Sequence, residues 1–151
     1  MATYRDVVPD GDLVATALPT GMTHDVVLRK RPSGPLEVRM PLALAGLRFA
    51  KDTSGRLRLT DTSGRLVAGA PEPQMWDAAA DSPDAGRRAA VATSIENGKA
   101  GPVLVLRPDS GFLADLSVQY PVTIDPWTTL ALQTDTFVST DYTSAPPLCP
   151  W

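Results

Sequence analysis

Residues 36–44 alternate strictly between two kinds of side chain, and this pattern constrains the fold more than any other. Large apolar residues occupy every second position: Leu36, Val38, Met40, Leu42 and Leu44. Successive side chains of a β-strand point to opposite faces, so a period of two places this set on one face of a strand. Pro41 has no N–H to donate to a neighbouring strand, which puts the strand at a sheet edge or beside a bulge.

A six-residue repeat follows this strand. The segment Asp52-Thr53-Ser54-Gly55-Arg56-Leu57 recurs as residues 61–66, with the same six residue types in the same order. An Asp side chain bonds the backbone two residues on, and Gly adopts a positive φ, so each copy is typical of a tight turn. After the first turn, Leu57 and Leu59 share one face, while Arg56, Arg58 and Thr60 share the other. The repeat predicts a β-meander of short hairpins.

Short strand-like segments with turn signals between them fill most of the remaining chain. They lie at 13–18, 26–28, 89–95, 103–106 and 120–124. Residues 4–11 are interpreted as irregular, and Pro32 to Pro35 as a hairpin-like connection between 26–28 and the strand after it. Short helical turns are expected at 74–80 and 110–116. We therefore expect an all-β fold: an antiparallel β-sandwich or open barrel-like meander of short strands with one or two short helical turns.

The charge and the hydropathy of the chain limit the kinds of partner that it can be expected to have. The formal net charge is −3 and charged residues make up 21% of the chain, with the tightest basic cluster at 29–31. Nucleic-acid binding usually needs a concentrated basic face, so the sequence predicts no nucleic-acid partner. No apolar run approaches the roughly 20 residues of a spanning helix, and membrane insertion is not expected.

Candidate catalytic and metal-binding residues are few. His24 is the sole histidine and Cys149 the sole cysteine, which excludes the usual zinc sets and leaves open whether Cys149 pairs elsewhere. Asp10-Gly11-Asp12 is similar to the start of a calcium loop but lacks the distal ligands, and turn chemistry explains it equally. We expect Asp109, Asp115 and Asp125 to be caps and turn residues. The sequence thus predicts no catalytic residue, no metal site, no cofactor and no enzymatic activity.

Three aromatic residues could bind a sugar. The rings of Trp76, Tyr120 and Trp127 could pack against the apolar C–H faces of a carbohydrate. In a chain with only 6% aromatic residues, the same rings are also needed to fill the core. These three residues are the candidate ligand-binding residues, with a core role as the alternative.

Three segments together resemble a known module. They are residues 4–13, residues 73–77 and the segment Gln119-Tyr120-Pro121-Val122-Thr123-Ile124-Asp125-Pro126. This set is similar to a β-rich module of large secreted actinobacterial proteins that contain DNRLRE-type, LamG-like or RHS/YD-repeat domains. The resemblance implies a module at 1–128 and the truncated start of a DNRLRE-like domain at 129–151. It also implies a secreted or cell-surface protein whose signal peptide lies upstream.

From these observations the sequence predicts a non-catalytic extracellular scaffold module that contacts neighbouring domains of its parent chain. A carbohydrate- or cell-wall-binding module, with polysaccharide as partner, is one alternative. A shell segment of an RHS-type polymorphic toxin is another.

Overall fold

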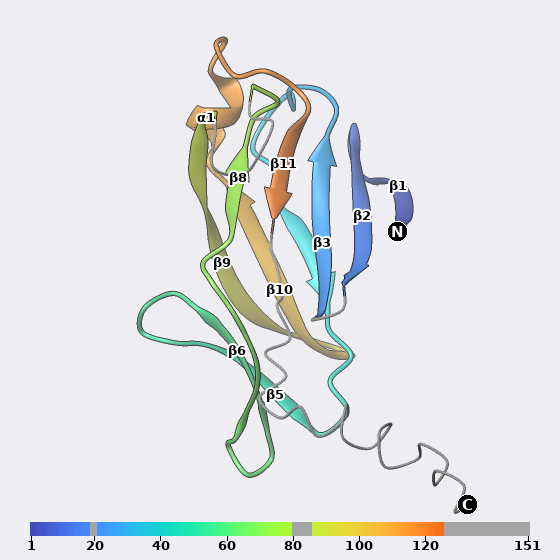
Figure 1. Cartoon of the computed structure of the whole chain (residues 1–151), viewed down its shortest axis with the longest axis vertical. Coiled ribbons are helices and arrows are strands. Elements are labelled where there is room, and N and C mark those ends of the chain that lie inside the picture. The colour runs from blue at the N-terminus through green and yellow to red at the C-terminus, as the bar shows by residue number, and fades with distance from the viewer. Residues whose placement is uncertain (19–20, 80–85, 126–151) are drawn as a thin grey trace, which may run out of the picture.

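A computed structural model describes residues 1–18, 21–79 and 86–125 (Figure 1). Nearly all of the regular structure is β-strand, which confirms the all-β prediction. Of the two architectures predicted, the barrel-like one is observed. The predicted start of a second domain at 129–151 lies outside the described residues, as do Trp127 and Cys149.

Eight antiparallel strands form one nearly closed barrel. Its strands follow the order β1-β2-β3-β11-β8-β9-β10-β4, so β1 and β4 are its two edges. Their bounds are β1 Ala2–Val8, β2 Gly11–Leu18, β3 Gly21–Leu28, β4 Val38–Pro41, β8 Gln74–Trp76, β9 Arg88–Gly98, β10 Gly101–Pro108 and β11 Val122–Asp125. The proline at the end of β4 lies on an edge strand, as its missing N–H predicts.

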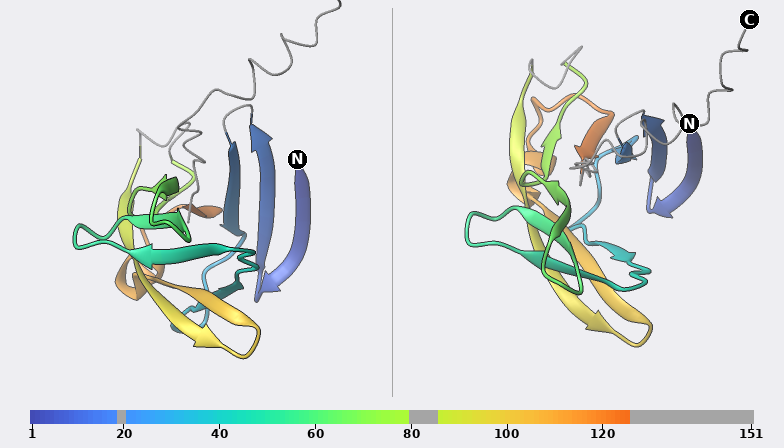
Figure 2. Two further views of the ribbon diagram at one scale, coloured as in Figure 1. Left: turned by 90° about the horizontal axis from the view of Figure 1, so that it is seen from below. Right: turned by 60° about the horizontal axis from the view of Figure 1, so that its bottom comes forward.

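A second, three-stranded sheet lies across one end of the barrel; we call it the small sheet. It consists of β5 (Leu47–Lys51), β6 (Leu57–Asp61) and β7 (Leu66–Ala70). Figure 2 shows it spanning the lower end of the barrel as drawn in Figure 1. The ammonium of Lys51 joins the two sheets by donating to the Thr93 carbonyl of β9 at 3.1 Å.

The repeated sequence builds the two turns of the small sheet. In the first turn the Asp52 carboxylate accepts the N–H groups of Ser54 at 2.9 Å and Arg56 at 3.0 Å. The second copy makes the same bonds from Asp61, again at 2.9 and 3.0 Å. Gly55 and Gly64 have φ values of 83° and 85°, which residues other than glycine adopt rarely. The predicted meander of hairpins is confirmed.

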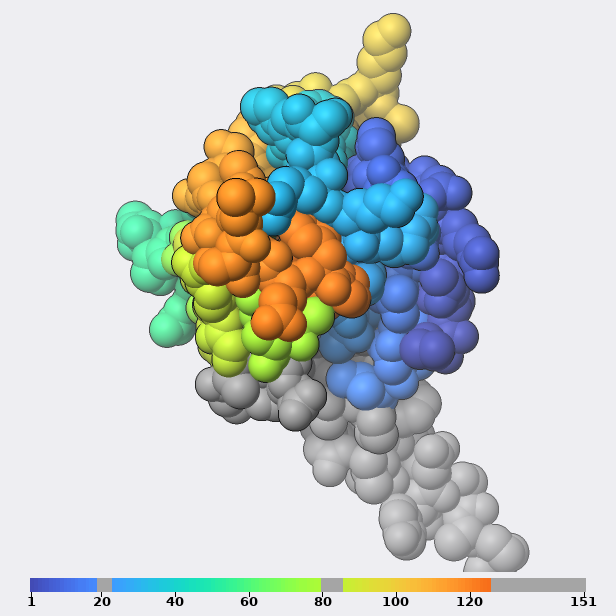
Figure 3. Space-filling view, turned by 90° about the horizontal axis from the view of Figure 1, so that it is seen from above, coloured from blue at the N-terminus to red at the C-terminus, as the bar shows by residue number. Residues whose placement is uncertain are grey.

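The core fills the inside of the barrel. Every strand of the barrel except β1 and β2 contributes a fully or almost fully buried side chain, among them Val26, Leu28, Val38, Met75, Val91, Leu106, Val122 and Ile124. The upper end is covered by α1 (Ser110–Ala114), the segment after it and the segment after β3, as Figure 3 shows from above. Leu113 of α1 is buried there, and Asp109 caps the helix by accepting the Phe112 N–H at 2.7 Å. The predicted helical turn at 110–116 is confirmed.

One buried carboxylate ties loops together at this upper end. The side chain of Asp77 is almost completely buried. It accepts the backbone N–H of Arg87 and that of Gln119, each at 3.3 Å. These bonds satisfy the carboxylate with donors from segments that flank β9 and β11, which stabilises the loops that close the barrel.

Three local predictions are wrong. Residues 4–11 are not irregular, because β1 pairs with β2, with its register shifted between Tyr4 and Val8. This strand is exposed on both faces except at Val8, so its sequence carries no alternation. Residues 74–76 form β8 and not a helical turn, because bonding to both β9 and β11 overrides local preference. Residues 26–28 do not pair with the strand after Pro35, since β2 and β11 already occupy both sides of β3.

No helix among the described residues is long and apolar enough to cross a lipid bilayer.

The barrel core predicts a sharp contrast between two leucines. Leu106 of β10 is 0% exposed and Leu116 is 87% exposed. Replacing Leu106 by Ala leaves a cavity and should lower the free energy of unfolding by about 3 kcal/mol. The same change at Leu116 should shift it by less than about 0.5 kcal/mol. Urea denaturation of both variants measures the difference, and similar losses at the two positions would contradict the packing described here.

Candidate functional site

An apolar cavity of about 280 Å³ lies between the small sheet and the lower end of the barrel. Residues from both sheets, and from the segment that connects them, line it: His24, Met40, Pro41, Leu42, Leu44, Phe49, Leu57, Leu59, Ala68, Gly69, Ala70 and Leu104. The small sheet provides its floor because the alternation of β5 and β6 turns Phe49, Leu57 and Leu59 toward the barrel. The cavity can accept an apolar group.

Among the described residues that line this cavity, His24 is the one that is ionisable. It belongs to β3, where it lies opposite Ala15 of β2. Burial lowers the pKa of His24 below its usual value, and the negative charge of Asp125 opposes that change in part. The imidazole is therefore neutral at pH 7, and it can act there as a hydrogen-bond or proton acceptor.

Two carboxylates lie on adjacent strands close to His24. The antiparallel register pairs Ile124 of β11 with Val26 of β3, so Asp125, which follows Ile124, lies opposite Asp25, which precedes Val26. Burial raises the pKa of Asp25 to about 6, and the like charge of Asp125 adds to this effect. Sequence reasoning treated Asp125 as a strand-ending residue and did not foresee this pair, because only the pairing of β3 with β11 brings it together.

Neither of the two predicted ligand-binding aromatics that the structure describes, Trp76 and Tyr120, lines this cavity. Trp76 is half-buried on β8. Tyr120 is half-buried as well, and its hydroxyl donates to the Leu113 carbonyl at 2.9 Å. The guanidinium of Arg31 lies 5.8 Å from the centre of the Tyr120 ring. Tyr120 thus packs against the upper end of the barrel, while Trp127 lies outside the described residues.

The acidic turn residues have bonding roles within the fold. Asp12 accepts the Asp6 N–H at 3.0 Å and an N–H of the Arg29 guanidinium, which also contacts Asp6. Asp115 accepts the Ser117 N–H at 2.8 Å and pairs with Arg87 at 2.8 Å. Among the described residues no group of three or more His, Cys, Asp or Glu side chains is placed to hold a metal ion.

A row of arginines crosses the outer face of the small sheet. Arg48 of β5, Arg58 of β6 and Arg56 just before β6 are all exposed; we call them the arginine row. The alternation of Arg56 and Arg58 with Leu57 and Leu59 in the sequence indicated a polar face at 56–60. The pairing of β5 with β6 adds Arg48 to it, which the sequence did not show.

Three curated proteins are similar to this chain over 92% of its length. They are "tRNA nuclease WapA" of Bacillus subtilis (strain 168) and "tRNA(Glu)-specific nuclease WapA" of Bacillus subtilis subsp. natto, both 31% identical over 141 residues, and "tRNA3(Ser)-specific nuclease WapA" of Bacillus spizizenii, 30% identical over 144 residues. The chain spans about 6% of the length of each of these relatives. No protein-family model and no solved structure matches it.

These relatives overturn several sequence predictions. Relatives named as tRNA nucleases conflict with four predictions: a non-catalytic scaffold module, a carbohydrate-binding module, no enzymatic activity and no nucleic-acid partner. Net charge and the basic residues that are adjacent in sequence, on which the prediction rested, do not show which charges the fold brings together. The prediction of no catalytic residue concerns these 151 residues, whereas the relatives are far longer.

The raised pKa of Asp25 predicts a stability that depends on pH. The folded-state pKa of about 6 exceeds the ordinary value of 3.8, so the stability that protonated Asp25 contributes is lost as the pH rises through 6. Asp25→Asn stays neutral and should be more stable than the parent chain at pH 7.5, by about 1 kcal/mol after allowance for solvent screening. The difference should shrink toward zero at pH 4. Urea midpoints at pH 4, 5, 6 and 7.5 test this, and an equal difference at every pH would exclude it.

Proposed function

We propose that this chain is a segment of a bacterial tRNA nuclease, and that the protein containing it cleaves tRNA. The observation that supports the proposal is the similarity of 92% of the chain to three proteins named as tRNA nucleases. The similar stretch runs through almost the whole chain and so includes both sheets, which argues for a shared fold and against a shared short motif.

The contribution of the segment is independent of which tRNA is cleaved. One relative is named as specific for tRNA(Glu) and another for tRNA3(Ser), yet the chain is 31% and 30% identical to them over the same share of its length. A segment that selected one tRNA would be expected to resemble one of these relatives more than the other. We infer that the segment acts on features common to all tRNAs, of which the phosphate backbone is the foremost.

Secretion of the parent protein remains a proposal of its own. It is supported by the resemblance of residues 119–126 to the module of large secreted proteins. Detection of the parent protein in culture medium by mass spectrometry, without cytoplasmic marker proteins, is the result that secretion predicts.

The proposal predicts the outcome of a segment exchange between two relatives. The region of the tRNA(Glu)-specific relative that matches this chain is replaced by the corresponding region of the tRNA3(Ser)-specific relative. The chimera should still cleave tRNA(Glu) and spare tRNA3(Ser), because the exchanged region does not choose the tRNA. Cleavage is read from total tRNA by gel electrophoresis and probing for the two tRNAs.

Two outcomes would contradict the proposal. Transfer of specificity to tRNA3(Ser) would show that the exchanged region selects the substrate. Separately, the protein that contains this chain should cleave tRNA under conditions in which the relatives do, and intact tRNA after that incubation would remove the nuclease assignment itself.

A further inference from the structure

We propose that the arginine row on the outer face of the small sheet binds the phosphate backbone of RNA. This inference rests on the proposed function and names the surface through which the segment contacts tRNA. It depends on four features of the structure: the alignment of the three arginines, their freedom from ion pairs, a hollow between two of them and the rigidity of their support.

The register of the small sheet aligns the three side chains. Ala50 lies opposite Arg58, and Arg48 lies opposite Thr60, two positions further along β6. Arg48 and Arg58 are therefore diagonal neighbours on one face, at a separation that long side chains span. Arg56 precedes Arg58 by two residues and extends the row toward the turn at 52–55.

These guanidinium groups are exposed, and near them lies the Asp52 carboxylate, whose pKa is lowered by the bond from Ser54 and also by the charge of Arg58. Among the ion pairs that join described residues, none includes a member of the arginine row. The outer face of β4, β9 and β10 is different, since Arg39 and Arg107 there alternate with Glu37 and Glu96 at 2.6–3.1 Å. The charges of Arg39 and Arg107 are thus balanced by two carboxylates, while no ion pair among the described residues balances the three charges of the row.

A hollow of about 420 Å³ lies beside the row. Arg56 and Arg58 both line it, together with Asp52 and apolar or small residues of β6 and β7. The Asp52 carboxylate accepts bonds from the Ser54 hydroxyl at 2.7 Å and from two backbone N–H groups, and its negative charge offsets part of the positive charge at this hollow. A phosphate in this hollow would meet two planar guanidinium forks, each able to donate two parallel hydrogen bonds to it.

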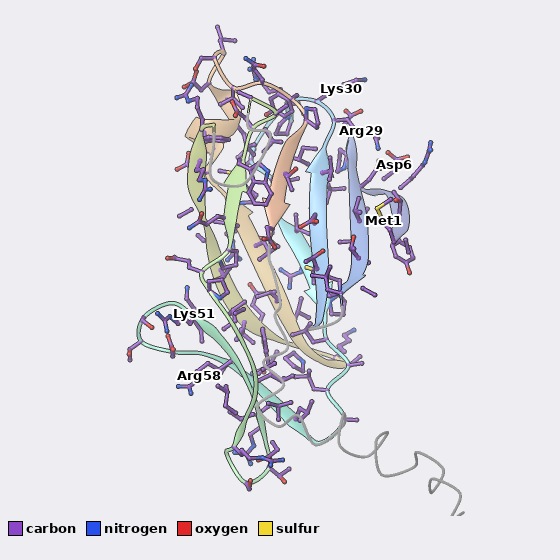
Figure 4. The ribbon with its side chains drawn as sticks, in the orientation of Figure 1. Met1, Asp6, Arg29, Lys30, Lys51 and Arg58 are labelled. Atoms are coloured by element: carbon purple, nitrogen blue, oxygen red, sulfur yellow. The ribbon has the colours of Figure 1, made fainter. Side chains whose placement is uncertain are left out.

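The support of the row is rigid and the row is accessible. Opposite the arginines, β5 and β6 bury Leu57 and pack Phe49 against the core, and Lys51 bonds the small sheet to β9. Figure 4 shows Lys51 and Arg58 on the small sheet, well apart from Arg29 and Lys30 near β1. A fixed row of positive charge on an outer surface suits an extended polyanion. Because the relatives are named as tRNA nucleases, RNA is the polyanion that we propose.

The test removes the three charges from the full 151-residue chain. The triple variant Arg48→Gln, Arg56→Gln, Arg58→Gln is compared with the parent chain for binding of fluorescently labelled total tRNA, by anisotropy between 20 and 200 mM salt. Neutralising three phosphate contacts should weaken binding at the lowest salt by about tenfold or more. The slope of log K against log salt should become less steep by about 3.

A matched control carries the same change in net charge at other places. The triple variant Arg5→Gln, Lys30→Gln, Lys99→Gln also removes three exposed positive charges, but none from the small sheet. It should bind tRNA almost as the parent chain does. A third variant, in which the three arginines of the row become Lys, keeps the charge and should retain the steep salt dependence. Circular dichroism and urea midpoints of all variants confirm that the fold is intact.

Several results would overturn the inference. Equal weakening by the control variant would assign binding to overall charge and not to the row. Loss of salt dependence in the Lys variant would point to a structural role of the three arginines. Saturable binding of polyglutamate without binding of tRNA would assign the row to an acidic protein. Any of these results together with tRNA cleavage by the parent protein would leave the proposed function standing, whereas absence of cleavage would end that proposal on its own.

Discussion

The packing of the small sheet across the end of the barrel is the interaction on which both candidate surfaces depend. A nearly closed antiparallel barrel exposes the end of its core unless something covers it, and here β5–β7 provide the cover (Figure 2). The alternation of strand side chains then divides the small sheet into two faces. Its apolar face, with Phe49 and Leu57, becomes the floor of the cavity, and its polar face carries the arginine row.

The two faces of the small sheet differ in the kind of ligand that they suit. The cavity is apolar except for His24, whose pKa burial lowers, and its chemistry suits an apolar group beside a neutral imidazole. The arginine row is charged and open, so its chemistry suits a phosphate backbone. A contact to the phosphate backbone would be the same for every tRNA, since phosphates carry no direct sequence information.

Much of the fold follows from local patterns in the sequence. The repeated Asp-Thr-Ser-Gly-Arg-Leu turns, the edge position of Pro41 and the helical turn capped by Asp109 depend on neighbouring residues, and all three were predicted. The candidate site depends on contacts between distant segments. His24 and Asp125 approach each other only because β11 pairs with β3, from which it is separated by about a hundred residues of chain. Arg48 and Arg58 become neighbours only through the pairing of β5 with β6. A pattern along the chain does not fix which strands become neighbours, so neither grouping was foreseen.

The most direct test of the central claim is a titration of the unaltered 151-residue chain with purified tRNA(Glu), tRNA3(Ser) and an RNA duplex of unrelated sequence at several salt concentrations. If the segment contacts the phosphate backbone through three arginines, the three RNAs should bind within about twofold of one another. The logarithm of the binding constant should fall with that of salt, with a slope of about −2 to −3. A preference of tenfold or more for one tRNA, or no binding of any RNA at low salt, would contradict the account.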